Sequence, residues 1–136
     1  ENVKALQLLT AGVVNDDNWR VQEMLAKAID HYCKMTGYGK ALPEIRKWLK
    51  DPHPNLNRAV VEGLRIWTSR PYFREHPQTA IDLISSLRSH ESEYLRKSVG
   101  NALRDISRKH PGLVREEIKN WDRKDVRVAF TLKRII

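Results

Sequence analysis

Apolar residues recur at intervals of three and four residues along almost the whole chain, which is the spacing of one face of an α-helix. No segment alternates apolar and polar residues as a half-buried strand would. Glycine and proline lie almost entirely between the periodic segments, where they mark breaks. The pattern therefore predicts an all-α chain, with helices at about residues 3–12, 18–35, 40–50, 55–69, 77–89, 92–109, 112–121 and 125–136.

The same apolar pattern returns along the chain at a fixed distance. A shift of 39 residues superposes Val21, Val60 and Val99, and likewise Leu25, Leu64 and Leu103. A period near 40 with two helices per unit is typical of HEAT and armadillo arrays, in which stacked units share one core. We expect a right-handed α-solenoid of HEAT-like two-helix repeats, forming a single domain over residues 1–136 and ending in a shortened copy at 124–136.

Each repeat also has a polar face at equivalent positions. Asn101 lies about 200° around its helix from the apolar residue Val99, so it is expected to point away from the core. Its equivalents in the two preceding repeats are Glu62 and Glu23. Three successive repeats would therefore present these side chains along one surface. Helical neighbours three or four residues away are Trp19, Lys27, Arg58, Arg65, Lys97, Arg104 and Asp105.

The residues alone leave two interpretations of this surface open. The charges can be solvated helix faces braced by ordinary ion pairs, each contributing about 0 to 1 kcal/mol. Alternatively, a cation-rich strip with a few carboxylates suits a polyanion whose reaction develops positive charge, because cations hold phosphates while carboxylates face the reacting sugar.

Composition favours an anionic partner and excludes several other chemistries. Lys and Arg number 25 against 17 Asp and Glu, so the net charge is +8 and the isoelectric point about 9.8. The histidines show no metal-ligand spacing, and no phosphate-binding glycine motif is present, so we expect neither a metal nor a cofactor.

The cellular setting follows from cysteine usage and hydropathy. A single cysteine, Cys33, excludes an internal disulfide and suits a reducing compartment, so we expect a cytoplasmic protein. No apolar run approaches the roughly 20 residues of a membrane span, so no membrane partner is expected. The chain begins at Glu1 and stops inside an apolar pattern, which is typical of an excerpt from a longer protein.

The tryptophans divide between the apolar and polar phases of the repeat. Trp48 and Trp67 fall on the apolar phase, which favours a place in the core. Trp19 is equivalent to Arg58 and Lys97 and lies off that phase, so it is the better candidate for stacking on a nucleotide.

Three segments resemble a known family: "NWRVQEMLAKAIDHY", "NRAVVEGLRIWTSRP" and "SEYLRKSVGNALRDISRKHPGLV". They are similar to the HEAT-like DNA alkylation repair proteins, the AlkC/AlkD superfamily of DNA glycosylases, closest to the AlkC side. The most specific parts are the E-G-x-R piece at Glu62 and the S-V-x-N-x-L-x-D-I piece that ends at Ile106. One departure is Arg70, which stands where the AlkC-like pattern has tryptophan.

This resemblance implies a solenoid whose concave basic face holds duplex DNA, alkylated or otherwise structured, and an enzyme that excises 3-methyladenine or 3-methylcytosine. The motif acids fall on Glu23, Glu62 and Asp105, which are the expected catalytic residues. Glu62 or Asp105 would stabilise the oxocarbenium-like sugar and orient water, and Glu23 would support the lesion side. Expected DNA contacts are Arg58, Arg65, Lys97, Asn101, Arg104 and, at the sugar or base, Trp19 or Trp67.

We expect the protein to act as a monomer. Two other functions fit the same residues: a noncatalytic member of this fold that binds bent or branched DNA, and a HEAT-type scaffold whose concave face binds an acidic protein segment.

Overall fold

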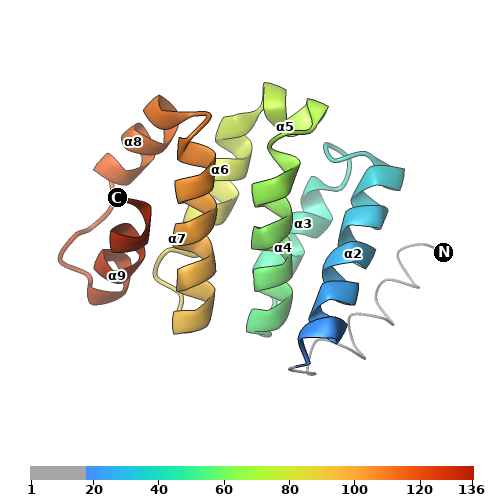
Figure 1. Cartoon of the computed structure of the whole chain (residues 1–136), viewed down its shortest axis with the longest axis horizontal. Helices are drawn as coiled ribbons and strands as arrows, with labels where there is room; N and C mark the ends of the chain where they lie inside the picture. The colour runs from blue at the N-terminus through green and yellow to red at the C-terminus, as the bar shows by residue number, and fades with distance from the viewer. Residues whose placement is uncertain (1–17) are drawn as a thin grey trace. The chain divides into compact units, whose positions relative to one another are not determined.

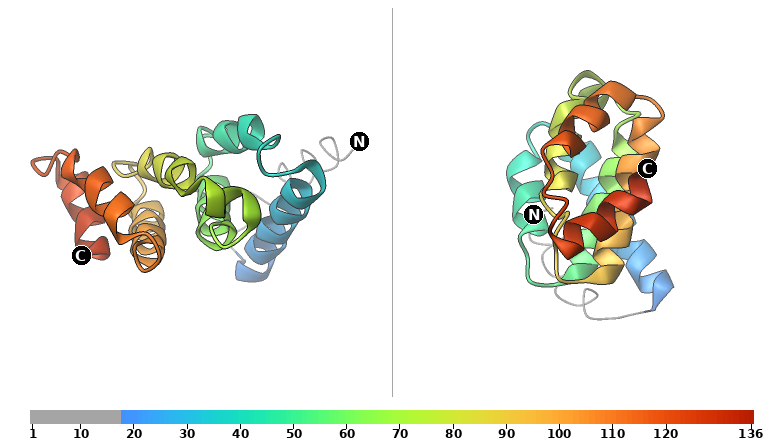
Figure 2. Two further views of the ribbon diagram at one scale, coloured as in Figure 1. Left: turned by 90° about the horizontal axis from the view of Figure 1, so that it is seen from above. Right: turned by 90° about the vertical axis from the view of Figure 1, so that its left-hand side faces the viewer.

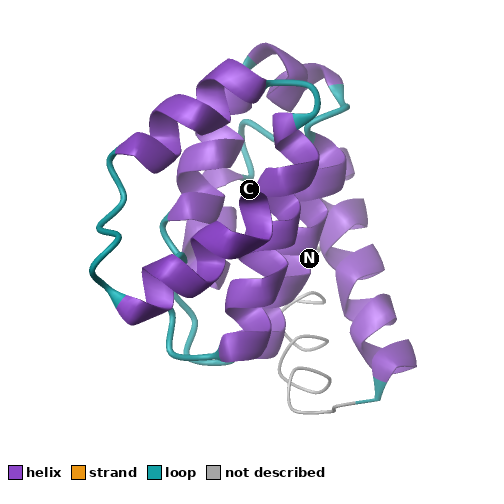
Figure 3. Ribbon diagram, turned by 60° about the vertical axis from the view of Figure 1, so that its left-hand side comes forward, coloured by secondary structure: helices purple, strands orange, loops and turns teal. Residues whose placement is uncertain are grey.

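The computed structural model describes residues 18–136, apart from the side chains of Trp19 and Val21 (Figure 1). This part of the chain contains helices and loops and no strand, which confirms the all-α prediction (Figure 3). The predicted helix at 3–12 lies outside the described residues. The helices are α2 (Trp19–Thr36), α3 (Leu42–Leu49), α4 (Pro54–Trp67), α5 (Pro71–Glu75), α6 (Pro77–Ser85), α7 (Glu93–Ser107), α8 (Pro111–Lys119) and α9 (Val126–Ile135).

Most helix boundaries agree with the sequence pattern to within a few residues, and one helix was missed. The α4 helix ends at Trp67, where the Thr68 hydroxyl donates to the Arg65 carbonyl and the Ser69 hydroxyl to the Ile66 carbonyl. The five-residue helix α5 follows directly, with proline at its first position. A helix of this length has too few residues to show a 3.6-residue period.

The chain divides into two compact units, Glu1–Gly63 and Leu64–Ile136, with the boundary inside α4. In the first unit, Leu25, Ile29 and Ile45 have no exposed surface. The fully buried Asn57 side chain donates to the Trp48 carbonyl (2.7 Å) and the Asp51 carbonyl (3.1 Å). These bonds fasten the start of α4 to the end of α3, since both acceptors lie at that end.

The second unit is organised around α7. This helix packs against α6, α8 and α9, and α6 also contacts α5 and α8 (Figure 2). Leu64, Ile81, Ile84, Leu95 and Leu103 have no exposed surface and form much of the core.

Burial follows the predicted repeat. Val60 and Val99, which the repeat aligns, are both fully buried, and so are Leu64 and Leu103. Burial thus recurs at equivalent positions of α4 and α7, as expected when each helix turns one apolar stripe inward.

The shortened last copy forms α9, which approaches α7 closely. The Asp125 side chain caps α9 by accepting from the backbone N–H groups of Arg127 and Val128. Gly100 of α7 faces α9 so closely that an added Cβ would collide with the Arg134 Cβ and lie 3.0 Å from the Thr131 carbonyl oxygen. Only glycine therefore permits this helix spacing.

Candidate functional site

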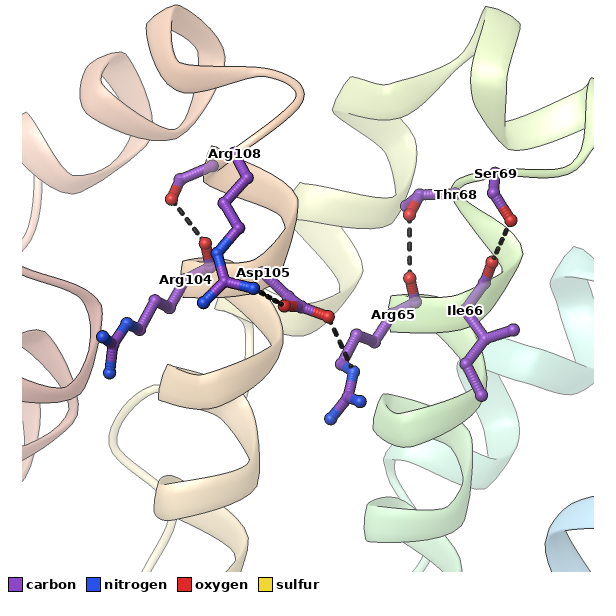
Figure 4. Close-up of polar contacts among 8 residues, drawn as sticks. Arg65, Ile66, Thr68, Ser69, Arg104, Asp105 and Arg108 are labelled. Atoms are coloured by element: carbon purple, nitrogen blue, oxygen red, sulfur yellow. Dashed lines mark hydrogen bonds and ion pairs between the residues drawn. The ribbon is translucent and has the colours of Figure 1, made fainter.

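Asp105 of α7 lies between two arginines. Its Oδ2 is 3.0 Å from the Arg65 Nε, and its Oδ1 is 3.1 Å from the Arg108 Nη1 (Figure 4). The Asp105 side chain is 40% exposed and that of Arg65 is 38% exposed. The carboxylate is therefore oriented by charge-assisted contacts and remains within reach of a ligand.

Helix packing explains why these side chains meet. Leu103 and Ile106 flank Asp105 in sequence and are buried, which fixes the rotation of α7. Leu64 is likewise buried beside Arg65. Asp105 and Arg65 consequently lie at the edge of the buried apolar face of their helices, where each side chain can reach the other.

The outer face of α7 carries further polar residues at helical spacing. Asn101 and Arg104 are exposed, and Arg104 extends away from the Asp105–Arg65 contact (Figure 4). The half-exposed Lys97 Nζ lies 3.9 Å from Glu93 one turn earlier. Such an i,i+4 contact between exposed groups is weak, so the lysine can exchange it for another anion.

The first unit contributes the other predicted site residues. Glu23 is exposed on α2 and its carboxylate lies 3.8 Å from the Lys27 Nζ. Arg58 and Glu62 lie one turn apart on α4, and both are half-buried. Trp19 begins α2, but its side chain lies outside the described residues, so its role stays a prediction.

The position of Trp67 corrects its assignment as a DNA contact. The side chain is 1% exposed and stacks on the Phe73 ring, with 6.3 Å between ring centroids and 17° between planes. A buried aromatic ring cannot stack on a sugar or base without unpacking its core, so Trp67 has the core role that its repeat phase favoured.

Two residues beside Asp105 and Arg65 were missed by sequence reasoning. Arg108 pairs with Asp105 at i,i+3 spacing, which is itself a signal readable in the sequence. Ile66 is 54% exposed next to Arg65 (Figure 4). It lies one turn after Glu62 and therefore on the polar face, where an apolar side chain is unexpected.

Within residues 18–136, no three or more His, Cys, Asp or Glu side chains gather as a metal site would require. No helix of that same stretch combines the length and the apolar character needed to cross a membrane.

Together, the helical repeats and the arginine-flanked carboxylate define a repeat protein with a cation-bearing polar face. Comparison with known families gives the particular class. The model of the family described as "DNA alkylation repair enzyme" matches residues 1–132, and the chain belongs to this family.

Relatives of known structure agree with this membership. AlkD2 from Streptococcus mutans is 52% identical with a TM-score of 0.92, covering 97% of this chain and 64% of its own. The Pseudomonas fluorescens alkylpurine DNA glycosylase AlkC, bound to DNA containing an abasic site analog, is 23% identical with a TM-score of 0.67. That match covers 88% of this chain and 37% of the AlkC chain, and it shows likeness of fold.

A curated relative matches a shorter region. The Bacillus subtilis protein named "uncharacterized protein YhaZ" is 33% identical over 86 residues, which are 60% of this chain and 24% of YhaZ. This chain thus spans less than two thirds of each of these three relatives. The match to AlkD2 and AlkC confirms the predicted HEAT-like repeat fold and the AlkC/AlkD superfamily.

Proposed function

We propose that this chain binds DNA through the cations of α4 and α7 and, within the whole protein, takes part in excising N-alkylated bases. One observation carries the proposal: the Asp105 carboxylate is accessible on a polar face and is held in place by Arg65 and Arg108. Family membership supports the same class of function.

Excision of an alkylated base requires few catalytic groups. A base alkylated at a ring nitrogen already carries positive charge and leaves readily, so no general acid is needed. The sugar develops positive charge as the glycosidic bond breaks, and a preorganised carboxylate stabilises it in the transition state. In our proposal Asp105 supplies this carboxylate and orients the attacking water.

The remaining site residues have supporting roles in the proposal. Glu62 is the alternative stabiliser, and Glu23 supports the lesion side. Ile66, which is exposed beside Arg65, takes the apolar contact with the sugar or base that Trp67 cannot make. Trp19 stays a second candidate for that contact. The proposed phosphate and backbone contacts are Arg58, Arg65, Lys97, Asn101 and Arg104.

A second candidate function is DNA binding without excision. The observation that favours it is the occupation of both Asp105 oxygens by guanidinium groups. The two guanidinium groups balance the negative charge of Asp105, which would otherwise stabilise the positively charged sugar. Asp105 would then serve to space Arg65 and Arg108 for phosphates.

The deciding experiment is release of free 3-methyladenine, 7-methylguanine and 3-methylcytosine from methylated duplex DNA by the intact protein, with unmethylated duplex as control. We expect release of at least one base. Tight binding without release would favour the noncatalytic candidate. DNA affinity should fall steeply with salt, because binding releases counterions from several phosphates. Absence of binding at low salt would exclude both DNA functions and favour the protein scaffold.

A further inference from the structure

Two arginines from different helices share one aromatic ring on the α7–α9 side of the second unit. The Arg96 guanidinium carbon lies 4.9 Å from the centroid of the Phe130 ring, and that of Arg134 lies 5.7 Å from it. Arg96 belongs to α7, whereas Phe130 and Arg134 belong to α9. Both distances fall within the range of cation–π attraction, so the ring holds both cations.

The close approach at Gly100 creates this arrangement. Gly100 follows Arg96 by one turn on α7, and the backbone of α9 at Thr131 and the Arg134 Cβ occupy the space that a side chain there would fill. The same approach brings the side chains of Arg96 and Arg134 to one ring. The arrangement is therefore built by the packing of α7 against α9.

Within residues 18–136, no carboxylate neutralises these two guanidinium groups. Neither Arg96 nor Arg134 forms an ion pair with any residue in the described part of the chain. Glu93, the acid three residues before Arg96, lies beside Lys97 instead. The Arg96 Nε is buried, and no hydrogen-bond acceptor reaches it within residues 18–136. Two like charges on one ring repel each other, so an anion that contacts both guanidinium groups would relieve this repulsion.

We propose that Arg96 and Arg134, oriented by Phe130, form a phosphate-binding site that receives the DNA backbone at the α9 side of the α7 cations. The identity of the ligand rests on the proposed DNA-binding function. Arg96 directly precedes Lys97 on α7, so the site borders the residues already proposed to hold phosphates, about 100° around the helix from Lys97. Arginine suits this role because its planar fork of donors matches phosphate oxygens.

The alternative is that the three side chains only fasten α9 to α7. The salt dependence of DNA affinity separates these roles, because a phosphate contact adds to its slope and a packing contact does not. The test uses the intact protein and a short unmodified duplex, comparing Arg96→Gln and Arg134→Gln with the wild type. The matched control is Arg115→Gln, an exposed arginine on α8.

We expect each of the two variants to bind more weakly and to reduce the slope of log K against log salt by about 0.9 per lost contact. The Arg115→Gln variant should keep the wild-type slope. A folded Arg96→Gln or Arg134→Gln protein with an unchanged slope would overturn the proposal, as would a variant that changes only the unfolding temperature.

A second measurement tests the site without DNA. Titrating inorganic phosphate while following the Arg96 Nε–H signal by NMR should give a saturable shift, which Phe130→Leu should weaken. This signal is suitable because burial shields the Nε–H from direct contact with water. A saturable NMR shift with phosphate, in a protein that binds no DNA, would support the anion site and overturn the assignment of DNA as its ligand. No response in either assay would exclude the site itself.

Discussion

Arg65 and Asp105 form an ion pair between α4 and α7, with 3.0 Å between Nε and Oδ2 (Figure 4). The other oxygen of Asp105 faces Arg108, the residue that directly follows α7. Any ligand that reaches this carboxylate must approach beside two guanidinium groups. In the proposed function, the two arginines would attract an anionic ligand, and the Asp105 carboxylate would stabilise the positive charge that develops on its sugar.

Replacing Asp105 by asparagine should separate excision from binding. Asparagine keeps the shape and removes the charge, so we expect base release to fall on the order of 100-fold, as for loss of one preorganised electrostatic group. DNA affinity should be kept or raised, since a negative charge leaves the binding face. Single-turnover release and equilibrium binding are the measurements. Asp122→Asn, in the exposed turn before α9, is the control and should retain both properties. Unchanged release by Asp105→Asn would remove Asp105 from the site.

The Arg65–Asp105 pair should contribute little to folding. Both side chains are more than a third exposed, so water and salt screen their attraction. A double-mutant cycle with Arg65→Gln and Asp105→Asn, measured by urea unfolding, should give a coupling free energy below about 1 kcal/mol that shrinks further at high salt. A coupling of several kcal/mol would show that the pair is structural, and it would weaken the case for its role in ligand binding.

Gly100→Ala should destabilise the protein, because the new methyl group would collide with the Arg134 Cβ and the backbone of α9. Overpacking of this kind costs about 1 to 3 kcal/mol in the free energy of unfolding. The matched control is Gly112→Ala in the first turn of α8, where nothing lies within 4 Å of the added methyl. That variant should be neutral or more stable by up to about 1 kcal/mol. Equal stability of the two variants in urea would contradict the close helix contact.

Ser85→Ala should also destabilise the protein, because the buried Ser85 hydroxyl joins α6 to two groups near α8. The Trp121 Nε1 donates to Ser85 Oγ (3.0 Å), and this hydroxyl donates to Glu117 Oε2 (3.0 Å). Losing it leaves the indole N–H buried without an acceptor, at about 1 to 3 kcal/mol. Ser86→Ala is the neighbouring control, since its exposed hydroxyl bonds only within its own turn. Urea unfolding should give a lower free energy of unfolding for Ser85→Ala than for Ser86→Ala. A loss of stability confined to Ser86→Ala would contradict the hydrogen bonds that Ser85 makes with Trp121 and Glu117.

The helices and their buried positions were predictable because they depend on local spacing. Val60, Leu64, Val99 and Leu103 recur at the helical period and at the repeat distance, and all four are fully buried. The short helix α5 was not predicted, because its 5 residues are too few to show the apolar period of a helix. The exposure of Glu23 and Asn101 agrees with their predicted polar phase, while their roles stay predictions.

The sequence by itself determined that the chain is helical, that its apolar phase repeats, and that it is basic, because periodicity and composition are local or additive properties. Only the tertiary structure decided which charges meet. The packing of separate helices decides that Asp105 pairs with Arg65 and that Trp67 stacks on Phe73. It also brings Arg96 and Arg134 to one ring. The spacing within one helix fixes which face a side chain occupies, but its partner is set by the rotation and distance of the neighbouring helix.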